Sequence, residues 1–90
     1  MTDFSTAPNN IGDALERYYV HGIPTGSFLR AVLCNDLFDA YGRADDINTH
    51  YMYRVVHWIY NNLPRDCYGN REIYDEWIES KRLEREVKHE

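Results

Sequence analysis

The chain has little that would place it in a membrane, a secretion pathway or an oxidising compartment. No stretch of its 90 residues approaches the roughly 18 consecutive apolar residues of a membrane-spanning helix. Residues 1–10 lack the charged and then apolar order of a signal peptide. Two cysteines, Cys34 and Cys67, could form one bridge but no disulfide framework. The sequence therefore predicts one small, soluble domain in a reducing cytosol.

An excess of positive charge is also missing. Ten Lys and Arg residues face fifteen Asp and Glu residues, so the formal net charge is −5. Domains that bind nucleic acid usually carry a basic patch or stripe, and direct binding to nucleic acid is not expected. Tyrosine, in contrast, is abundant, with eight residues beside two tryptophans. Such amphipathic rings suit both a small core and a subunit interface, so we expect a homo-oligomer.

Sustained alternation of apolar and polar residues, the mark of a β-strand, does not occur, whereas helical spacing recurs along the chain. Capping residues, glycines and prolines divide this pattern into segments. The predicted fold is all-α, a single bundle-like domain of about four short helices. These helices are expected at residues 10–21, 27–41 and 47–62, and from Gly69-Asn70 to about Glu79. The expected N-caps are Asn9 and Asn10, Asp45 and Asp46, and Asn70, and Gly22 is expected to end the first helix. The expected core face of the third helix consists of Ile47, Tyr51, Val55, Trp58 and Ile59.

Three parts of the chain differ in character. Residues 1–9 contain one large apolar side chain, Phe4, and are interpreted as a flexible N-terminal arm. Residues 10–79 form the helical domain. Residues 80–90 are a charged C-terminal tail of mixed sign, either an exposed helical extension or a frayed end.

Asp36 is the least expected residue of this pattern. It projects from the apolar stripe of the second predicted helix, which consists of Leu29, Val32, Leu33, Leu37 and Ala40. A carboxylate in such a place needs a cation or hydrogen-bond donors. We expect a buried pair with Arg43, Arg17 or a tyrosine hydroxyl that fixes how the helices dock; a ligand contact is the alternative.

Motifs of catalysis and metal binding are missing. His50 and His57 share a helix face but stand about 10 Å apart along the axis, whereas two ligands on one helix prefer a spacing of four. No signature of a nucleophile surrounds Ser27, Cys34 or Cys67. We therefore assign no catalytic residue, no metal and no cofactor, and expect a protein that is not an enzyme.

The first candidate for ligand binding is the start of the second predicted helix, at Gly26-Ser27. Glycine permits close approach to the backbone, and the free N–H groups of a first helical turn attract phosphate. Arg30 lies one turn further on. The simpler interpretation is an ordinary helix start with Ser27 as its cap.

The second candidate is the polar face of the third predicted helix. Tyr53, Arg54 and His57 lie there between His50 and Tyr60. Flat rings could stack on a nucleobase while Arg54 meets a phosphate. A solvated face and a subunit interface are the other interpretations.

The middle of the chain resembles a family of short proteins found in tailed-phage and prophage genomes. The stretches that carry the resemblance are Leu15-Glu16-Arg17-Tyr18, His21-Gly22-Ile23-Pro24, Gly26-Ser27-Phe28-Leu29-Arg30-Ala31-Val32-Leu33, Asn35-Asp36-Leu37, Gly42-Arg43-Ala44-Asp45, Ile59-Tyr60-Asn61, Pro64 and Trp77. Members of that family usually lack the charged tail found here after Ile78. The resemblance implies an accessory protein in the cytoplasm of an infected bacterium, with no catalytic residues to carry across.

Two functions follow from this setting, by analogy with other small phage proteins. One is a stoichiometric sponge for a cyclic nucleotide or related immune signal, of the anti-CBASS or anti-Thoeris type, bound by Gly26, Ser27, Arg30, Tyr53, Arg54 and His57. The alternative is an inhibitor of the anti-CRISPR type that binds a host defence protein, since an acidic, tyrosine-rich protein suits a basic surface. A small nucleotide hydrolase and a plain structural or regulatory phage protein remain open.

Overall fold

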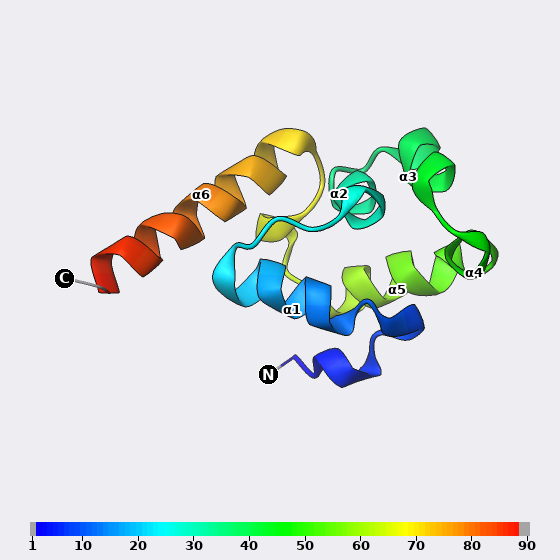
Figure 1. Ribbon diagram of the computed structural model, residues 1–90, viewed down its shortest axis with the longest axis horizontal. Helices are drawn as coiled ribbons and strands as arrows, with labels where there is room; N and C mark the ends of the chain where they lie inside the picture. The colour runs from blue at the N-terminus through cyan, green and yellow to red at the C-terminus, as the bar shows by residue number, and fades with distance from the viewer. Residues whose placement is uncertain (1, 89–90) are drawn as a thin grey trace.

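The computed structural model describes residues 2–88, with side chains for residues 2–86, and every regular element in that part of the chain is a helix. Figure 1 shows how the helices are arranged. The α-helices are α1 (Gly12–His21), α2 (Ser27–Leu33), α3 (Leu37–Arg43), α4 (Asp46–His50), α5 (Met52–Asn62) and α6 (Arg71–Lys88). Three short 3-10 turns, at Phe4–Thr6, Pro8–Asn10 and Arg65–Cys67, complete the elements. The predicted all-α class is confirmed, but six α-helices replace the expected four.

The main core lies where α1, α5 and α6 meet. Leu15 and Tyr18 of α1 are fully buried together with Val55 of α5, as their helical spacing predicts. The Tyr18 hydroxyl donates a hydrogen bond of 2.7 Å to the carbonyl of Cys67. The Tyr18 ring stacks on Tyr74 of α6, with centroids 5.1 Å apart. These buried tyrosine rings, whose hydroxyls are hydrogen-bonded, fill a part of the core that the aliphatic residues alone would leave empty.

The second predicted helix is broken at Asn35. Asn35 adopts a left-handed conformation with φ of 60°, which asparagine tolerates better than most residues. Its N–H and that of Asp36 bond back to the carbonyls of Val32 and Ala31 at 3.0 and 2.9 Å, which is a Schellman ending for α2. Asp36 then caps α3 by accepting from the N–H of Asp39. The expectation of one continuous helix over 27–41 was wrong because Asn-Asp ends one helix and begins the next.

The third predicted helix is also two helices. Asp45 caps α4 by accepting a 2.7 Å hydrogen bond from the N–H of Asn48, as expected. Tyr51, with φ of −111° and ψ of 27°, then separates α4 from α5. Ile47, predicted to face the core, is exposed as a result, whereas Val55, Trp58 and Ile59 are buried as predicted.

The N-terminal segment packs against the body of the protein. Phe4 lies 5.6 Å from Trp58, measured between ring centroids, and Trp58 Nε1 donates to the Thr6 hydroxyl at 2.9 Å. These contacts differ from the expectation of a loose arm, because the one large apolar residue of the segment finds a place on the core. Asn9 and Asn10, expected to cap α1, have positive φ instead, and α1 begins at Gly12.

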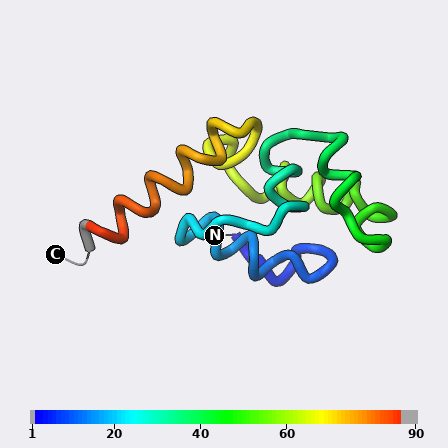
Figure 2. The backbone as a smooth tube through the Cα atoms, turned by 45° about the horizontal axis from the view of Figure 1, so that its top comes forward, coloured from blue at the N-terminus to red at the C-terminus, as the bar shows by residue number. Residues whose placement is uncertain are grey.

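The N-terminal part of α6 packs against other helices, and its C-terminal part extends away from them. Asn70 caps α6 by accepting from the N–H of Ile73 at 2.8 Å, as predicted. Trp77 stacks on Tyr19 of α1 at 5.4 Å. Lys81 lies against Gly22 at the end of α1, and beyond it α6 projects away from the other helices (Figures 1 and 2). Of the two alternatives for the tail, the structure places residues 80–88 in a helical extension.

Candidate functional site

A groove of about 520 Å³ lies between α2 and α3 on one side and α5 on the other, with the start of α6 at one end. Its floor is aliphatic and comes from buried residues, among them Ala31, Ala40, Met52 and Ile59. The volume falls within the range of about 300–1,000 Å³ that is usual for ligand sites. The break between α2 and α3 lies on this groove, since Asn35, Asp36 and Leu37 all line it.

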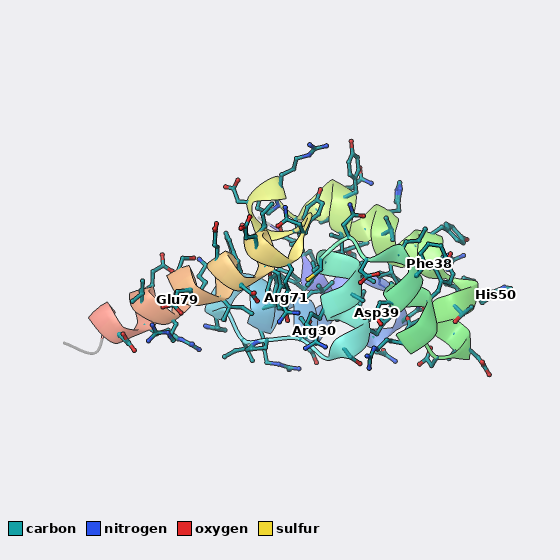
Figure 3. The ribbon with its side chains drawn as sticks, turned by 90° about the horizontal axis from the view of Figure 1, so that it is seen from above. Arg30, Phe38, Asp39, His50, Arg71 and Glu79 are labelled. Carbon is teal, nitrogen blue, oxygen red and sulfur yellow. The ribbon has the colours of Figure 1, made fainter. Side chains whose placement is uncertain are left out.

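Large apolar side chains stand exposed along the groove and next to it. Leu37, Val56 and Tyr60 line it, with exposed fractions of 62%, 48% and 63%. On α3, Phe38 is 90% exposed and Tyr41 is 46% exposed; Figure 3 labels Phe38 at the outer surface of α3. We call these five residues the α3–α5 face. Exposed apolar side chains that gather on neighbouring elements are typical of interaction sites.

Two charged residues line the groove, Asp36 where α3 begins and Arg65 after α5, and further carboxylates follow Asp36 along α3 and α4. Residues 35–50 contain four Asp residues and one basic residue, Arg43, which pairs with Asp39 at 3.2 Å. Asp36 lines the groove, and both it and Asp45 accept only backbone capping bonds in the described structure. The segment over residues 35–50 is therefore acidic, while the groove lining itself holds one residue of each sign.

Asp36 itself is exposed and makes no buried pair. The expectation that it would dock helices from within the core was wrong, because the end of α2 turns the residue outward to the helix-capping position. Its carboxylate instead lies at the edge of the groove. The alternative interpretation, a contact to a ligand, stays a prediction.

Tyr53, Arg54 and His57 lie together, as predicted, in a second and shallower hollow on the opposite flank of α5. The Arg54 guanidinium carbon lies 4.7 Å from the centroid of the Tyr51 ring and 5.8 Å from that of Tyr53. Arg54 Nε also donates to the Tyr53 hydroxyl at 3.1 Å, and this bond raises the pKa of Arg54. The arrangement offers one cation among exposed rings.

Gly26, Ser27 and Arg30 line neither hollow. Ser27 makes no capping bond, contrary to its expected role. A Cβ placed on Gly26 meets nothing within 4 Å, so crowding does not require glycine there. Arg30 is half-buried, and Figure 3 shows it near Arg71 at the start of α6. The structure therefore separates this half of the predicted site from Tyr53, Arg54 and His57.

The two thiols are held in their protonated form. Cys67 is fully buried, and this burial raises its pKa to about 12. Burial also raises the pKa of Cys34, against the opposing influence of Arg71 and Arg30. Both cysteines are free. A thiol with a raised pKa is a weak nucleophile at neutral pH.

Within residues 2–88, no group of three or more His, Cys, Asp or Glu side chains is placed to hold a metal ion. In the same part of the chain, no helix has the length and apolar character needed to cross a membrane. Comparison with protein-family models, with curated proteins and with solved structures finds no match for this chain.

Proposed function

We propose that this protein acts by binding another protein stoichiometrically through the α3–α5 face. The observation that carries the proposal is the exposure of Leu37, Val56 and Tyr60 on the groove, together with that of Phe38 and Tyr41 on α3. Aromatic and aliphatic side chains of this kind are the usual anchors of protein interfaces. A partner that covers these exposed apolar side chains would explain why they gather on α3 and α5.

The biological setting of the proposal comes from the resemblance to short phage and prophage proteins. In that setting the partner is a host defence protein in the bacterial cytoplasm, and this chain is an inhibitor of it, without catalysis. The net charge of −5 supports the idea of docking on a basic surface. A stoichiometric inhibitor needs only affinity and abundance, which a domain of 90 residues can provide.

A pair of matched variants tests the proposal. Val56→Glu places a charge on the α3–α5 face, and Val20→Glu places the same charge on α1, at a valine of similar exposure (44%) outside the groove. Immobilised wild-type protein should retain a defined bacterial protein at fixed stoichiometry. We expect the Val56→Glu variant to lose it and the Val20→Glu variant to keep it. Equal retention by both variants would refute the proposal.

A nucleotide sponge remains the second candidate, on the strength of the hollow that holds Tyr53, Arg54 and His57. Stacking of a base on Tyr53 and a phosphate on Arg54 would use that hollow. Native mass spectrometry with cyclic oligonucleotides and ADP-ribose-type signals tests it and measures the oligomeric state, for which a homo-oligomer stays our proposal. Intact ligand on wild-type protein but not on Arg54→Ala would support the sponge; no retained ligand would remove it.

A further inference from the structure

We infer that this chain forms a dimer by exchanging its N-terminal segment, residues 2–8, so that each copy packs the segment of its partner against α1 and α5. This inference concerns a surface other than the α3–α5 face and does not rest on the function proposed above. It combines the contacts of the segment with the backbone conformation of Asn9 and Asn10, which join the segment to the rest of the chain.

The N-terminal segment is held by contacts that a second copy offers equally well. The Phe4 ring lies next to both Trp58 of α5 and Tyr19 of α1, with ring centroids 5.6 and 6.1 Å away. Trp58 Nε1 also donates a hydrogen bond of 2.9 Å to the Thr6 hydroxyl. Trp58 and Tyr19 belong to the helical body, so exchange of the segment between two copies would preserve these contacts.

The segment also carries its own local structure. Asp3 accepts hydrogen bonds from the N–H and the hydroxyl of Ser5, at 3.0 and 2.6 Å. The N–H groups of Thr6 and Ala7 bond back to the carbonyls of Asp3 and Phe4, both at 3.2 Å. These bonds lie within residues 3–7 and would move with the segment. Since none of residues 2–10 is buried, the segment can leave the body without exposing an enclosed side chain of its own.

The connection between the segment and the body favours exchange. Asn9 and Asn10 both have positive φ, 54° and 63°, where the chain doubles back before α1 (Figure 1). Asparagine tolerates this left-handed conformation better than most residues but less well than glycine, so the pair carries a cost. In an exchanged dimer the connection extends toward the partner, and both copies lose this cost. Strained hinge connections promote the exchange of segments for this reason.

Exchange would turn the hollow that holds Tyr53, Arg54 and His57 into a shared site. Thr6 and Pro8 line that hollow beside those three residues. In the exchanged dimer Thr6 and Pro8 come from the partner, so each hollow is complete only when two copies are present.

Variants at an exposed hinge residue test the role of the connection. Asn10→Gly should remove the backbone cost and favour the unexchanged monomer, whereas Asn10→Val should raise the cost, because a β-branched residue adopts positive φ with difficulty. Each dimer contains two hinges, so we expect the dissociation constant to rise at least about tenfold in Asn10→Gly and to fall at least about tenfold in Asn10→Val. Size-exclusion chromatography with light scattering, over a dilution series, measures it.

The matched control is Asn35→Gly. Asn35 is also exposed and has φ of 60°, but it lies between α2 and α3 rather than at the hinge. The substitution therefore relieves the same kind of backbone cost at a place where no exchange is proposed. It should leave the dissociation constant of the dimer unchanged.

The exchanged contact is tested in the wild-type protein. Isotope-labelled and unlabelled chains are unfolded together and refolded, so that mixed dimers form. Isotope-filtered NOE spectroscopy then detects contacts between chains only, and we expect NOEs from the Phe4 ring of one copy to the Trp58 ring of the other.

Three results would overturn the inference: a wild-type protein that stays monomeric at the millimolar concentrations of NMR, a dimer without the contact between Phe4 and Trp58 of different chains, or one dissociation constant shared by Asn10→Gly and Asn10→Val. None of these results bears on whether the α3–α5 face binds a bacterial protein, which the Val56→Glu variant tests separately.

Discussion

Tyrosine is buried in one region of this molecule, where α1 meets α6, and exposed in another, on the α3–α5 face. Tyr18 and Tyr74, where α1 meets α6, stack on each other and satisfy their hydroxyls within the protein. Tyr41 and Tyr60, on the α3–α5 face, are exposed. The chain therefore buries some tyrosines with their hydroxyls hydrogen-bonded, and the α3–α5 face leaves two others exposed to solvent. The packing of α1 against α6 therefore stabilises the fold, and the α3–α5 face is the surface that we propose binds a partner.

The largest effect on stability should come from removing a buried tyrosine ring where α1 meets α6. Tyr18→Ala removes a fully buried side chain and the hydrogen bond to Cys67, and we expect it to lower the free energy of unfolding by about 4 kcal/mol. Tyr60→Ala should cost no more than about 0.5 kcal/mol, since that ring is exposed. Urea unfolding of both variants gives the comparison. Similar losses in both would mean that the face is part of the folding core.

Alkaline pH should lower the free energy of unfolding through two buried groups, Cys67 and Tyr18. An unfolded thiol loses its proton near the reference pKa of 9.0, whereas buried Cys67 keeps its proton up to about pH 12. Between these values the unfolded state binds fewer protons, so stability falls as the pH rises, by up to about 1.4 kcal/mol per pH unit. Burial raises the pKa of Tyr18 as well, which adds a loss of the same sign.

Unfolding curves between about pH 8 and about pH 11 measure this slope. The matched variant is Cys67→Ala, which should unfold more easily at neutral pH but show a shallower dependence above pH 9. A slope that this substitution leaves unchanged would contradict the role given to the buried thiol.

Substitution of two glycines, Gly22 and Gly42, should change stability in opposite directions. Gly22 ends α1 with φ of +68°, and a Cβ there would lie 2.4 Å from that of Lys81 on α6; Gly22→Ala should cost about 1–2 kcal/mol or more. Gly42 lies within α3 with nothing within 4 Å of its Cβ position. Gly42→Ala should therefore stabilise the protein by about 0.5–1 kcal/mol through helix propensity. Thermal unfolding of the two variants should give shifts of opposite sign.

The smallest effect on stability is expected at Asp36. Asparagine caps helices about as well as aspartate, so Asp36→Asn should change the free energy of unfolding by less than about 0.5 kcal/mol, whereas Asp36→Ala should cost about 1 kcal/mol. Breaking a buried ion pair would cost about 3–5 kcal/mol. A loss of that size in Asp36→Asn, measured by urea unfolding, would restore the interpretation of Asp36 as a core residue.

Much of the fold could be predicted from local sequence because local signals decide it. Gly22, Asp45 and Asn70 mark helix ends by their own conformations and capping bonds, and all three were placed correctly. The buried positions of α1 follow from helical spacing. The breaks at Asn35 and Tyr51 were missed, because the apolar period continues across them and favours a longer helix.

The groove could not be predicted for the same reason. A continuous helix over residues 27–41 would carry Leu37 and Ala40 on one buried stripe, and only the break at Asn35 separates them into an exposed and a buried residue. The available signal was Asn35-Asp36, a left-handed residue followed by a capping residue. The predicted cluster of Tyr53, Arg54 and His57 needed only one helix face, and it does lie together.

In-cell photo-cross-linking tests the central claim most directly. Benzoylphenylalanine replaces Phe38, the most exposed residue of the α3–α5 face, and in a second protein it replaces Val20 on α1. The protein is expressed in bacteria, irradiated and analysed by denaturing electrophoresis and mass spectrometry. We expect one discrete adduct with a bacterial protein from position 38 and none from position 20. No adduct at position 38, the same adduct from both positions, or an adduct only with a second copy of the chain would contradict the account.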